Sequence, residues 1–372
     1  MIMHPDYNNS ILNVTATILK HYHAPSIYAS IPELEAYLRY QPKHVILVLL
    51  DGMGIDIINR YLNPDDFIRK HLKKTITSVF PPTTVAATNA VLSGLPPYSS
   101  GYLGWVQYFK KEKTNQIVFL NQDFYDPNIK FDFVFRERYL NYPTIYEQIV
   151  RNSPNQKTYE LFPSFRANGF DSFSQQADRV VELTKKDEEN FTYIYWTEPD
   201  FTEHDFGTVA DQTEQVLRLL NEQVERLSQQ INQDTLFIVI ADHGFADVVG
   251  IDLFDDLEIM NMLRRKPSME PRATNFFVKP LMKKKFKNIF NKKYGNDFIL
   301  YKKEELYQAG LLGFGVKHPM LEDFIGDYIA ISVSDKMFNF KEHSKFLGHH
   351  AGLTKKEMEV PLVIFYKDKD NL

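Results

Sequence analysis

Continuous apolar runs that alternate with helix-like segments dominate the hydrophobic pattern of the chain. The runs occupy residues 44–50, 191–196 and 235–240. A run of this length, bounded by turn residues, is typical of a strand buried on both faces of a parallel sheet. Apolar residues at helical spacing occur at 55–61 and at 209–231. Strands that alternate with helices predict an α/β fold, with a mostly parallel central sheet and helices on both faces.

Each apolar run ends near an acidic or imidazole side chain. Asp51 follows the first run, Asp200 lies shortly after the second, and Asp242 and His243 follow the third. An aspartate after a strand is often a turn residue, and this alone would account for any one of these positions. Because ligands of open α/β sheets bind at the carboxyl ends of the strands, the three endings together indicate one common site.

Two of the expected helices can be assigned an inner face. The helix at 209–231 is expected to bury Val216, Leu217, Leu219, Leu220, Val224 and Leu227. The lysine-rich segment 279–293 is expected to form a solvated helix face, with Phe286, Ile289 and Phe290 packed beneath it. A role for these lysines in attracting an anionic substrate is the alternative.

The segment 245–345 departs from the alternating pattern. It is rich in lysine and contains only short expected strands, at 298–300 and 327–331. We expect a small α+β cap over 245–345, inserted into a catalytic α/β domain. That domain comprises residues 1–244 and 346–372.

The composition excludes several kinds of site. The 372 residues include no Cys, which rules out a disulfide framework, thiolate ligation of zinc and a Cys nucleophile. Any transition metal must therefore be held by carboxylates and by some of the 11 His. The formal net charge of −5 provides no basic field for nucleic acid, so no nucleic-acid partner is expected.

Neither a membrane span nor export is expected. No apolar run approaches the roughly 20 residues that cross a bilayer as a helix. Residues 1–19 lack the basic and apolar regions of a signal peptide. We therefore expect a cytoplasmic protein, whose oligomeric state the sequence does not indicate.

The segment EPDFTEH, which begins at Glu198, has the spacing of a metal site. Asp200 and His204 are four residues apart, so they would share one face of a helix. His349 and His350 lie in a glycine-flanked loop. The full candidate set is Asp51, Asp200, His204, Asp242, His243 and one of His349 and His350. Three carboxylates and three imidazoles suffice for two divalent ions with an open position on each.

A threonine is the candidate nucleophile. Thr84 follows the sequence Pro-Pro-Thr and precedes a helix-like segment, so we expect it at a helix N-terminus. Backbone N–H groups and the helix dipole favour an anion there. The same residues could form only an ordinary helix cap. Beside two metal ions, however, a threonine hydroxyl can be activated as a nucleophile.

Five motifs give the chain a resemblance to a known family. They are DGMG at Asp51, PPTTVAATNAVLSGL at Pro81, EPDFTEH at Glu198, ADHG at Ala241, and GHHAGLT at Gly348 followed by VPLVI. Their residues and their order resemble the alkaline phosphatase superfamily, and within it the nucleotide pyrophosphatase/type I phosphodiesterase branch. The resemblance extends over about residues 43–366. It implies the alkaline-phosphatase-like sandwich fold.

The resemblance also implies an activity and a ligand set. The chain would be a metal-dependent phosphoester hydrolase of phosphodiesterase type, acting on a small molecule such as a nucleotide. Thr84 matches the family's nucleophile, which forms a phospho-threonine that water then hydrolyses. Asp200, His204 and His350 would hold one ion, and Asp51, Asp242 and His243 would hold the other together with Thr84. The ions would be Zn²⁺, with Mn²⁺ as the alternative.

The family motif has one residue between its first glycine and its histidine, which selects His350 over His349. The chain departs from the branch at other positions. Residues 85–87 are Val-Ala-Ala where the branch has Phe-Pro-Asn, and Trp105 stands where it supplies an asparagine to the phosphate. We expect the Thr84 N–H to serve as the substitute donor. These departures leave a phosphatase, a phosphotransferase or phosphomutase, and a non-catalytic metal-binding scaffold as alternatives.

Overall fold

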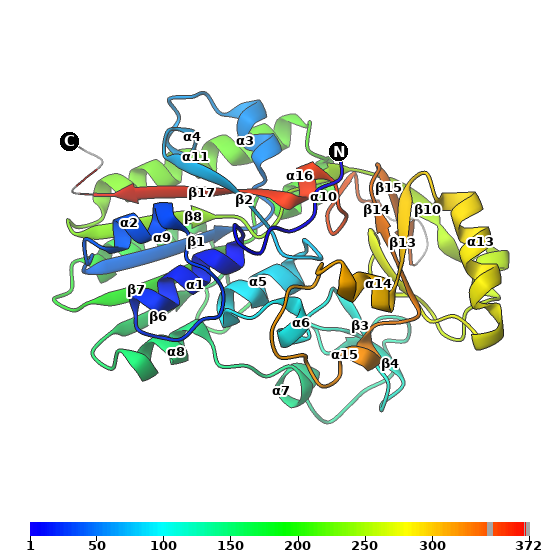
Figure 1. Cartoon of the computed structure of the whole chain (residues 1–372). Helices are drawn as coiled ribbons and strands as arrows, with labels where there is room; N and C mark the ends of the chain where they lie inside the picture. The colour runs from blue at the N-terminus through cyan, green and yellow to red at the C-terminus, as the bar shows by residue number, and fades with distance from the viewer. Residues whose placement is uncertain (341–344, 368, 370–372) are drawn as a thin grey trace.

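A six-stranded sheet forms the centre of the computed structural model, which describes residues 1–340, 345–367 and 369 (Figure 1). In spatial order its strands are β2 (Leu72–Thr77), β17 (Glu359–Tyr366), β8 (Thr235–Ile240), β1 (His44–Leu50), β7 (Asn190–Trp196) and β6 (Lys157–Leu161). Strands β8, β1, β7 and β6 run parallel, whereas β17 is antiparallel to both of its neighbours. The predicted α/β fold and its mostly parallel central sheet are therefore confirmed.

Every residue of β1 is buried, which requires cover on both faces of the sheet. Two groups of mutually contacting helices provide it (Figure 1). One group is α1 (Ile11–His21), α2 (Pro32–Leu38), α5 (Thr84–Ser93) and α8 (Ile145–Asn152). The other is α3 (Ile55–Tyr61), α4 (Phe67–Lys70), α9 (Phe173–Thr184), α10 (Asp200–Phe206) and α11 (Asp211–Gln230). The helices predicted at 55–61 and 209–231 are α3 and α11.

A second sheet of seven strands lies beside the first (Figure 1). Its order is β13 (Phe298–Lys302), β14 (Tyr328–Ser332), β12 (Ala273–Phe276), β11 (Ser268–Glu270), β3 (Val106–Phe109), β4 (Thr114–Ile117) and β5 (Gln122–Asp123). Four of these strands come from the expected cap, residues 245–345, and the other three come from residues 106–123. The division into a catalytic domain and an inserted cap stays a prediction, and residues 341–344 lie outside the described part of the chain.

Short elements complete the fold. Two two-stranded ribbons pair β9 (Ala246–Asp247) with β16 (Gly348–His349) and β10 (Val249–Asp252) with β15 (Lys336–Asn339). The remaining helices are α6 (Pro97–Ser100), α7 (Phe135–Tyr139), α12 (Leu257–Met260), α13 (Lys283–Tyr294), α14 (Lys303–Gln308), α15 (Leu321–Phe324) and α16 (Lys355–Met358), with 3₁₀ turns at Leu253–Asp255 and Pro280–Met282. Within the described ranges, none of the helices combines the length and the apolar character that crossing a bilayer requires.

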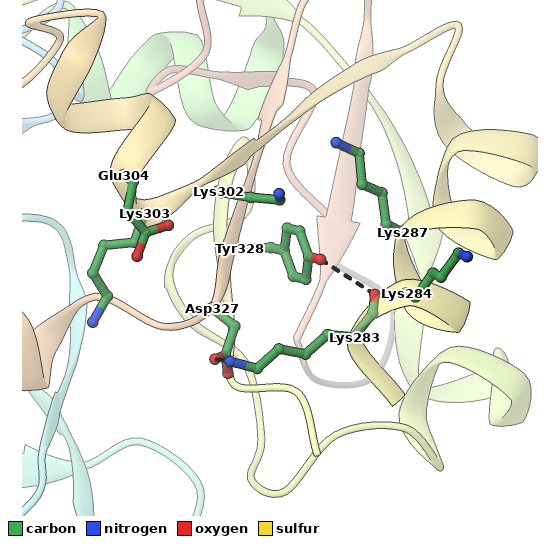
Figure 2. Close-up of a pocket in the computed structure, with 8 residues that line it drawn as sticks. All are labelled: Lys283, Lys284, Lys287, Lys302, Lys303, Glu304, Asp327 and Tyr328. Carbon is green, nitrogen blue, oxygen red and sulfur yellow. Dashed lines mark hydrogen bonds and ion pairs between the residues drawn. The ribbon is translucent and has the colours of Figure 1, made fainter. Parts of the chain in front are cut away.

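Helix α13 forms the lysine-rich face that the sequence predicts. Phe286 and Phe290 are fully buried beneath it, and Ile289 packs against the same cluster. Lysines of α13 and of the β13–α14 corner line a cavity of about 530 Å³ on this face (Figure 2). Asp327 also lines it, and its carboxylate pairs with Lys283 at 2.6 Å. The apolar residues therefore anchor the helix, while its lysine side chains are mostly exposed and two of them, Lys283 and Lys293, form ion pairs.

Candidate functional site

The candidate ligands meet at the carboxyl edge of the central sheet because their strands are neighbours. Strand β1 lies between β7 and β8, and all three are in parallel register. Backbone hydrogen bonds continue this alignment beyond the strands. The Asp51 N–H donates to the Trp196 carbonyl at 2.9 Å, and the Asp200 N–H donates to the Asp51 carbonyl at 3.0 Å. Asp51 and Asp200 are thereby held side by side.

Asp200, His204 and His350 form a first group whose ligand atoms all lie within 4.8 Å of one another. The segment after Pro199 is helical, as α10, so Asp200 and His204 share one face as predicted. The Nε2 atoms of His204 and His350 are each 3.7 Å from Asp200 Oδ1. The His204 Nδ1–H donates to the Gly348 carbonyl at 3.0 Å, which ties α10 to the loop that carries His350.

Asp51, Asp200 and His243 form a second group with the same spacing of ligand atoms. His243 Nε2 lies 3.3 Å from Asp51 Oδ1 and 3.4 Å from Asp242 Oδ2. Asp200 Oδ1 is 3.8 Å from the same nitrogen and therefore belongs to both groups. The two groups, each made of side chains that commonly bind divalent metal ions, thus share the carboxylate of Asp200.

The surroundings of these side chains fit a divalent cation. Asp200 Oδ1 and Asp242 Oδ2 are buried and accept no hydrogen bond from the described residues. Burial raises the pKa of Asp51 to about 6, and burial with the neighbouring carboxylates raises the pKa values of Asp200 and Asp242 well above the ordinary value. Burial lowers the pKa of His204 to about 4 and that of His350 well below its usual range. A cation would offset the carboxylate repulsion and bind the neutral imidazoles.

Thr84 lies beside two members of this cluster, Asp51 and His243. It is the first residue of α5, with Thr83 as the N-cap, so its helix-terminal position agrees with the prediction. Its Oγ1 is 3.2 Å from His243 Nε2 and 3.5 Å from Asp51 Oδ1. The side chain is only partly buried, whereas Asp51 and His243 are buried. Thr84 is therefore more exposed than the two candidate ligands that its hydroxyl contacts.

The two adjacent histidines have different neighbours. His350 belongs to the first ligand group, whereas His349 does not. The His349 Nδ1 instead accepts a hydrogen bond from the His350 N–H at 2.8 Å. His349 also pairs with Ala246 through the ribbon of β9 and β16, which brings this loop to the end of β8.

Three residues that contact the site or its neighbours, Tyr195, Ser78 and Glu270, were not singled out by sequence reasoning. The buried Tyr195 hydroxyl donates to Asp51 Oδ2, and the Ser78 hydroxyl donates to the Asp242 carbonyl at 2.5 Å. The Trp105 N–H donates to Glu270 Oε1 at 2.6 Å, so Trp105 is tied to the second sheet. Nothing in the hydrophobic pattern separates Tyr195 from the other aromatic residues of its strand.

Comparison with known proteins relates the whole fold to solved structures. Murine ectonucleotide pyrophosphatase/phosphodiesterase 5, as an inactive variant in complex with AMP, shares 17% identity and a TM-score of 0.64, covering 87% of this chain and 88% of that one. The human form shares 16% identity and a TM-score of 0.63, with 87% of each chain covered. Phosphonoacetate hydrolase from Sinorhizobium meliloti, in complex with phosphonoformate, shares 16% identity and a TM-score of 0.64, covering 87% and 90%. These similarities confirm the predicted alkaline-phosphatase-like fold.

The sequence profile of the type I phosphodiesterase/nucleotide pyrophosphatase family matches residues 45–353. This range includes Thr84 and all the candidate metal ligands, and it confirms the resemblance carried by the five motifs. The chain therefore belongs to the type I phosphodiesterase/nucleotide pyrophosphatase family of the alkaline phosphatase superfamily and is a hydrolase of phosphoester or phosphoanhydride bonds.

Proposed function

We propose that this protein is a two-metal phosphodiesterase or nucleotide pyrophosphatase that uses Thr84 as its nucleophile. Asp200, His204 and His350 would hold one divalent ion, and Asp51, Asp242 and His243 the other, together with Thr84. The ions are Zn²⁺ in this proposal, with Mn²⁺ as the alternative, because mixed imidazole and carboxylate sites accept both. A cytoplasmic location and a cap over residues 245–345, inserted into a catalytic domain of residues 1–244 and 346–372, belong to the same proposal.

One observation carries the proposal. The Thr84 Oγ1 lies 3.2 Å from His243 Nε2 and 3.5 Å from Asp51 Oδ1, two members of the second ligand group, and Thr84 is only partly buried. A nucleophile needs this combination of access and an activating neighbourhood. The inactive murine relative carries alanine in place of a threonine, which supports a threonine nucleophile in this fold.

In the proposed reaction, each step involves particular residues of the chain. The Thr84 hydroxyl gives up its proton and its oxygen bonds to phosphorus while the bond to the leaving oxygen breaks, which gives a phospho-threonine and a released alcohol that takes up a proton. The N–H groups of the first turn of α5 have no partner within the helix, and they can donate to the phosphoryl oxygens. A water then forms the next bond to phosphorus, the bond to Thr84 breaks, and the hydroxyl is restored. When bound, two divalent ions supply positive charge that stabilises the entering and leaving oxygens.

The proposed substrate is a small phosphodiester or a nucleotide. One structural relative binds AMP and another binds phosphonoformate, so both hold small molecules that contain phosphorus. The Thr84 hydroxyl is the only threonine oxygen in the described chain for which hydrogen-bond contacts to both Asp51 and His243 are observed. The chemistry is therefore proposed to occur at this point.

The proposal is tested with two chromogenic substrates. The protein is stripped with EDTA and reloaded with Zn²⁺ or Mn²⁺, and p-nitrophenolate release is followed from bis-p-nitrophenyl phosphate and p-nitrophenyl phosphate. We expect the diester to be hydrolysed faster, with no turnover after EDTA treatment. Preference for the monoester would indicate a phosphatase, and phosphate transfer to an added alcohol would indicate a transferase. Ion binding without hydrolysis of either compound would indicate a scaffold and contradict the proposal.

A further inference from the structure

The corner that follows β11 contacts both halves of the candidate site. Glu270 ends this strand of the second sheet, and Arg272 lies two residues further on. The exposed fraction of Glu270 is 2% and that of Arg272 is 0%, so both ionisable groups are buried. Buried ionisable groups are retained only where specific partners satisfy them. The partners of these two residues lie on either side of the site.

Glu270 holds the residue that precedes the proposed nucleophile. Its Oε1 accepts the Thr83 hydroxyl at 2.7 Å and the Trp105 N–H at 2.6 Å. Thr83 is the N-cap of α5, yet its side chain makes no capping hydrogen bond to that helix. The hydroxyl is directed to Glu270 instead, although a threonine at this position ordinarily caps its own helix. The position of Thr84 is thus linked through Thr83 to the second sheet.

Arg272 holds the loop of the last metal ligand through Glu357. Its guanidinium donates to both oxygens of this buried carboxylate, from Nε at 2.6 Å and from Nη2 at 2.8 Å. It also donates to the backbone carbonyls of Ser334 and Lys336, at 2.9 Å each. A guanidinium with four such bonds fixes the orientation of its partner.

Glu357 in turn accepts hydrogen bonds from the loop that carries His350 and from the loop that carries His243. Its Oε1 accepts the Gly352 N–H at 2.7 Å, two residues after His350. Its backbone carbonyl accepts the Gly244 N–H at 2.8 Å, one residue after His243. A Cβ at Gly352 would lie 2.8 Å from both Glu357 carboxylate oxygens, so the close approach requires glycine there. Loops that carry ligands from both groups are therefore anchored to one residue, the His350 loop through its carboxylate and the His243 loop through its backbone carbonyl.

We propose that Glu270 and Arg272 are positioning residues by which the second sheet sets the geometry of the catalytic site. Glu270 acts on Thr84 through Thr83, and Arg272 acts on His243 and His350 through Glu357. This inference rests on the proposed function, because it assigns both residues a role toward the nucleophile and the ligands named there. Residues that orient ligands in this way typically change metal affinity or activity by about 10- to 100-fold when they are replaced.

The Glu270 link is tested with paired variants of the two residues that form it. Thr83→Val and Glu270→Leu each remove the hydrogen bond, and we expect kcat to fall about 10- to 100-fold with KM and Zn²⁺ content unchanged. Glu270→Gln keeps an acceptor oxygen and should restore kcat. The double variant Thr83→Val with Glu270→Leu should be no worse than either single one, since both remove the same link. Full kcat in Thr83→Val, which leaves Glu270 in place, would overturn this half of the proposal.

The Arg272 link is tested by metal binding rather than by activity. Titration with Zn²⁺ should show binding about 10- to 100-fold weaker in Arg272→Met, with a smaller loss in Arg272→Lys. Hydrogen exchange of the Gly352 amide should accelerate in the metal-free forms of both variants. A residue needed only for folding would lower the melting temperature and leave the Zn²⁺ affinity of the folded protein unchanged. That result in Arg272→Lys, which keeps the buried positive charge, would overturn this half of the proposal.

The same experiments separate this inference from the proposed function. If Thr84→Ala stays active, the proposed nucleophile is wrong, and the Zn²⁺ titrations of the Arg272 variants still report on the ligand loops. If Thr84→Ala is inactive while the Thr83, Glu270 and Arg272 variants all behave as the wild type, only the positioning role is wrong.

Discussion

His349 and His350 are adjacent in the chain but differ in what their imidazoles contact. His350 Nε2 faces Asp200, whereas His349 Nδ1 accepts the backbone N–H of His350. We therefore predict that His350→Ala lowers the bound metal by one ion per chain, because it removes a ligand. His349→Ala serves as the matched control and should keep the full stoichiometry. Elemental analysis after gel filtration measures both, and equal metal loss in the two variants would contradict the assignment of His350.

The buried carboxyl group of Glu270 should make the free energy of unfolding depend on pH. Burial raises its pKa from 4.5 to about 7 in the folded protein. Because the folded state binds the proton more tightly, this group's contribution to stability is full below about pH 4.5 and is lost as the pH rises through 7. The loss amounts to about 3 kcal/mol.

Replacing Glu270 by glutamine removes this titration. The free energy of unfolding of wild type minus that of Glu270→Gln should fall between pH 4.5 and 8, as measured by urea denaturation at a series of pH values. A difference that stays constant over this range would show that the carboxyl group titrates normally.

Residue types alone pointed to the candidate ligands but not to the residues that support them. Aspartate and histidine at strand ends are few, and their chemistry restricts what they do, so Asp51, Asp242 and His243 could be singled out as candidates. Tyr195 supports Asp51 across 144 residues of sequence, and Arg272 supports Glu357 across 85. Contacts at such separations depend on how the elements pack, and no local pattern records them.

At the scale of elements, two glycines let the turns after β1 and β8 touch. A Cβ at Gly244 would lie 2.2 Å from the Lys356 carbonyl oxygen and 3.0 Å from Gly54 Cα. Gly244→Ala would therefore push β8's turn away from α16 and displace His243. We predict a loss of about 3 kcal/mol in the free energy of unfolding, together with weaker Zn²⁺ binding.

Gly310→Ala is the matched control for this prediction. Gly310 has φ +65° and no atom within 4 Å of the added Cβ, so only backbone strain of about 1 kcal/mol is expected, with Zn²⁺ binding intact. Chemical denaturation and Zn²⁺ titration compare the two variants. Equal effects in both would show that the turn contact does not position the ligand.

Helices and strands were predictable where the pattern of apolar residues is strong. One residue of α11 was assigned to the wrong face of the helix. Strands β1, β7 and β8 match their apolar runs because they are buried on both faces. In α11 the prediction that Leu219 lies on the inner face was wrong, since its side chain is 52% exposed. At 100° per residue Leu219 lies about 160° from the buried Leu217. The apolar character of a residue therefore does not by itself show that it lies on the buried face of a helix.

At the scale of the whole molecule, the second sheet could not be predicted from the sequence. Strands β3, β4 and β5 precede residue 124, yet they join strands from residues 268–332 through the contact of Val106 with Met269. Short strands carry weak local signals, and their pairing is decided by tertiary contacts. In the central sheet, strands β1, β7 and β8 could be predicted because each is a continuous apolar run followed by a helix or by turn residues.

Metal ions should stabilise the whole molecule, since the buried carboxylates repel one another without them. We predict that Zn²⁺ at a hundredfold excess over its Kd raises the free energy of unfolding at pH 8 by about 3 kcal/mol relative to EDTA-treated protein. The double variant Asp51→Asn with Asp200→Asn removes two of the clustered charges and should lose most of this increment. Denaturation curves with and without Zn²⁺ measure it, and an increment that persists in the double variant would place the ions elsewhere.

The central claim is that Thr84 attacks phosphorus at a site where two groups of side chains bind two metal ions. The most direct measurement compares wild type and Thr84→Ala, both loaded with Zn²⁺, for hydrolysis of bis-p-nitrophenyl phosphate and for metal content. We predict that turnover falls at least about a thousandfold. The metal content should stay at two ions per chain, because the proposed aspartate and histidine ligands are unchanged. Turnover near the wild-type rate in Thr84→Ala, with both ions bound, would contradict the claim.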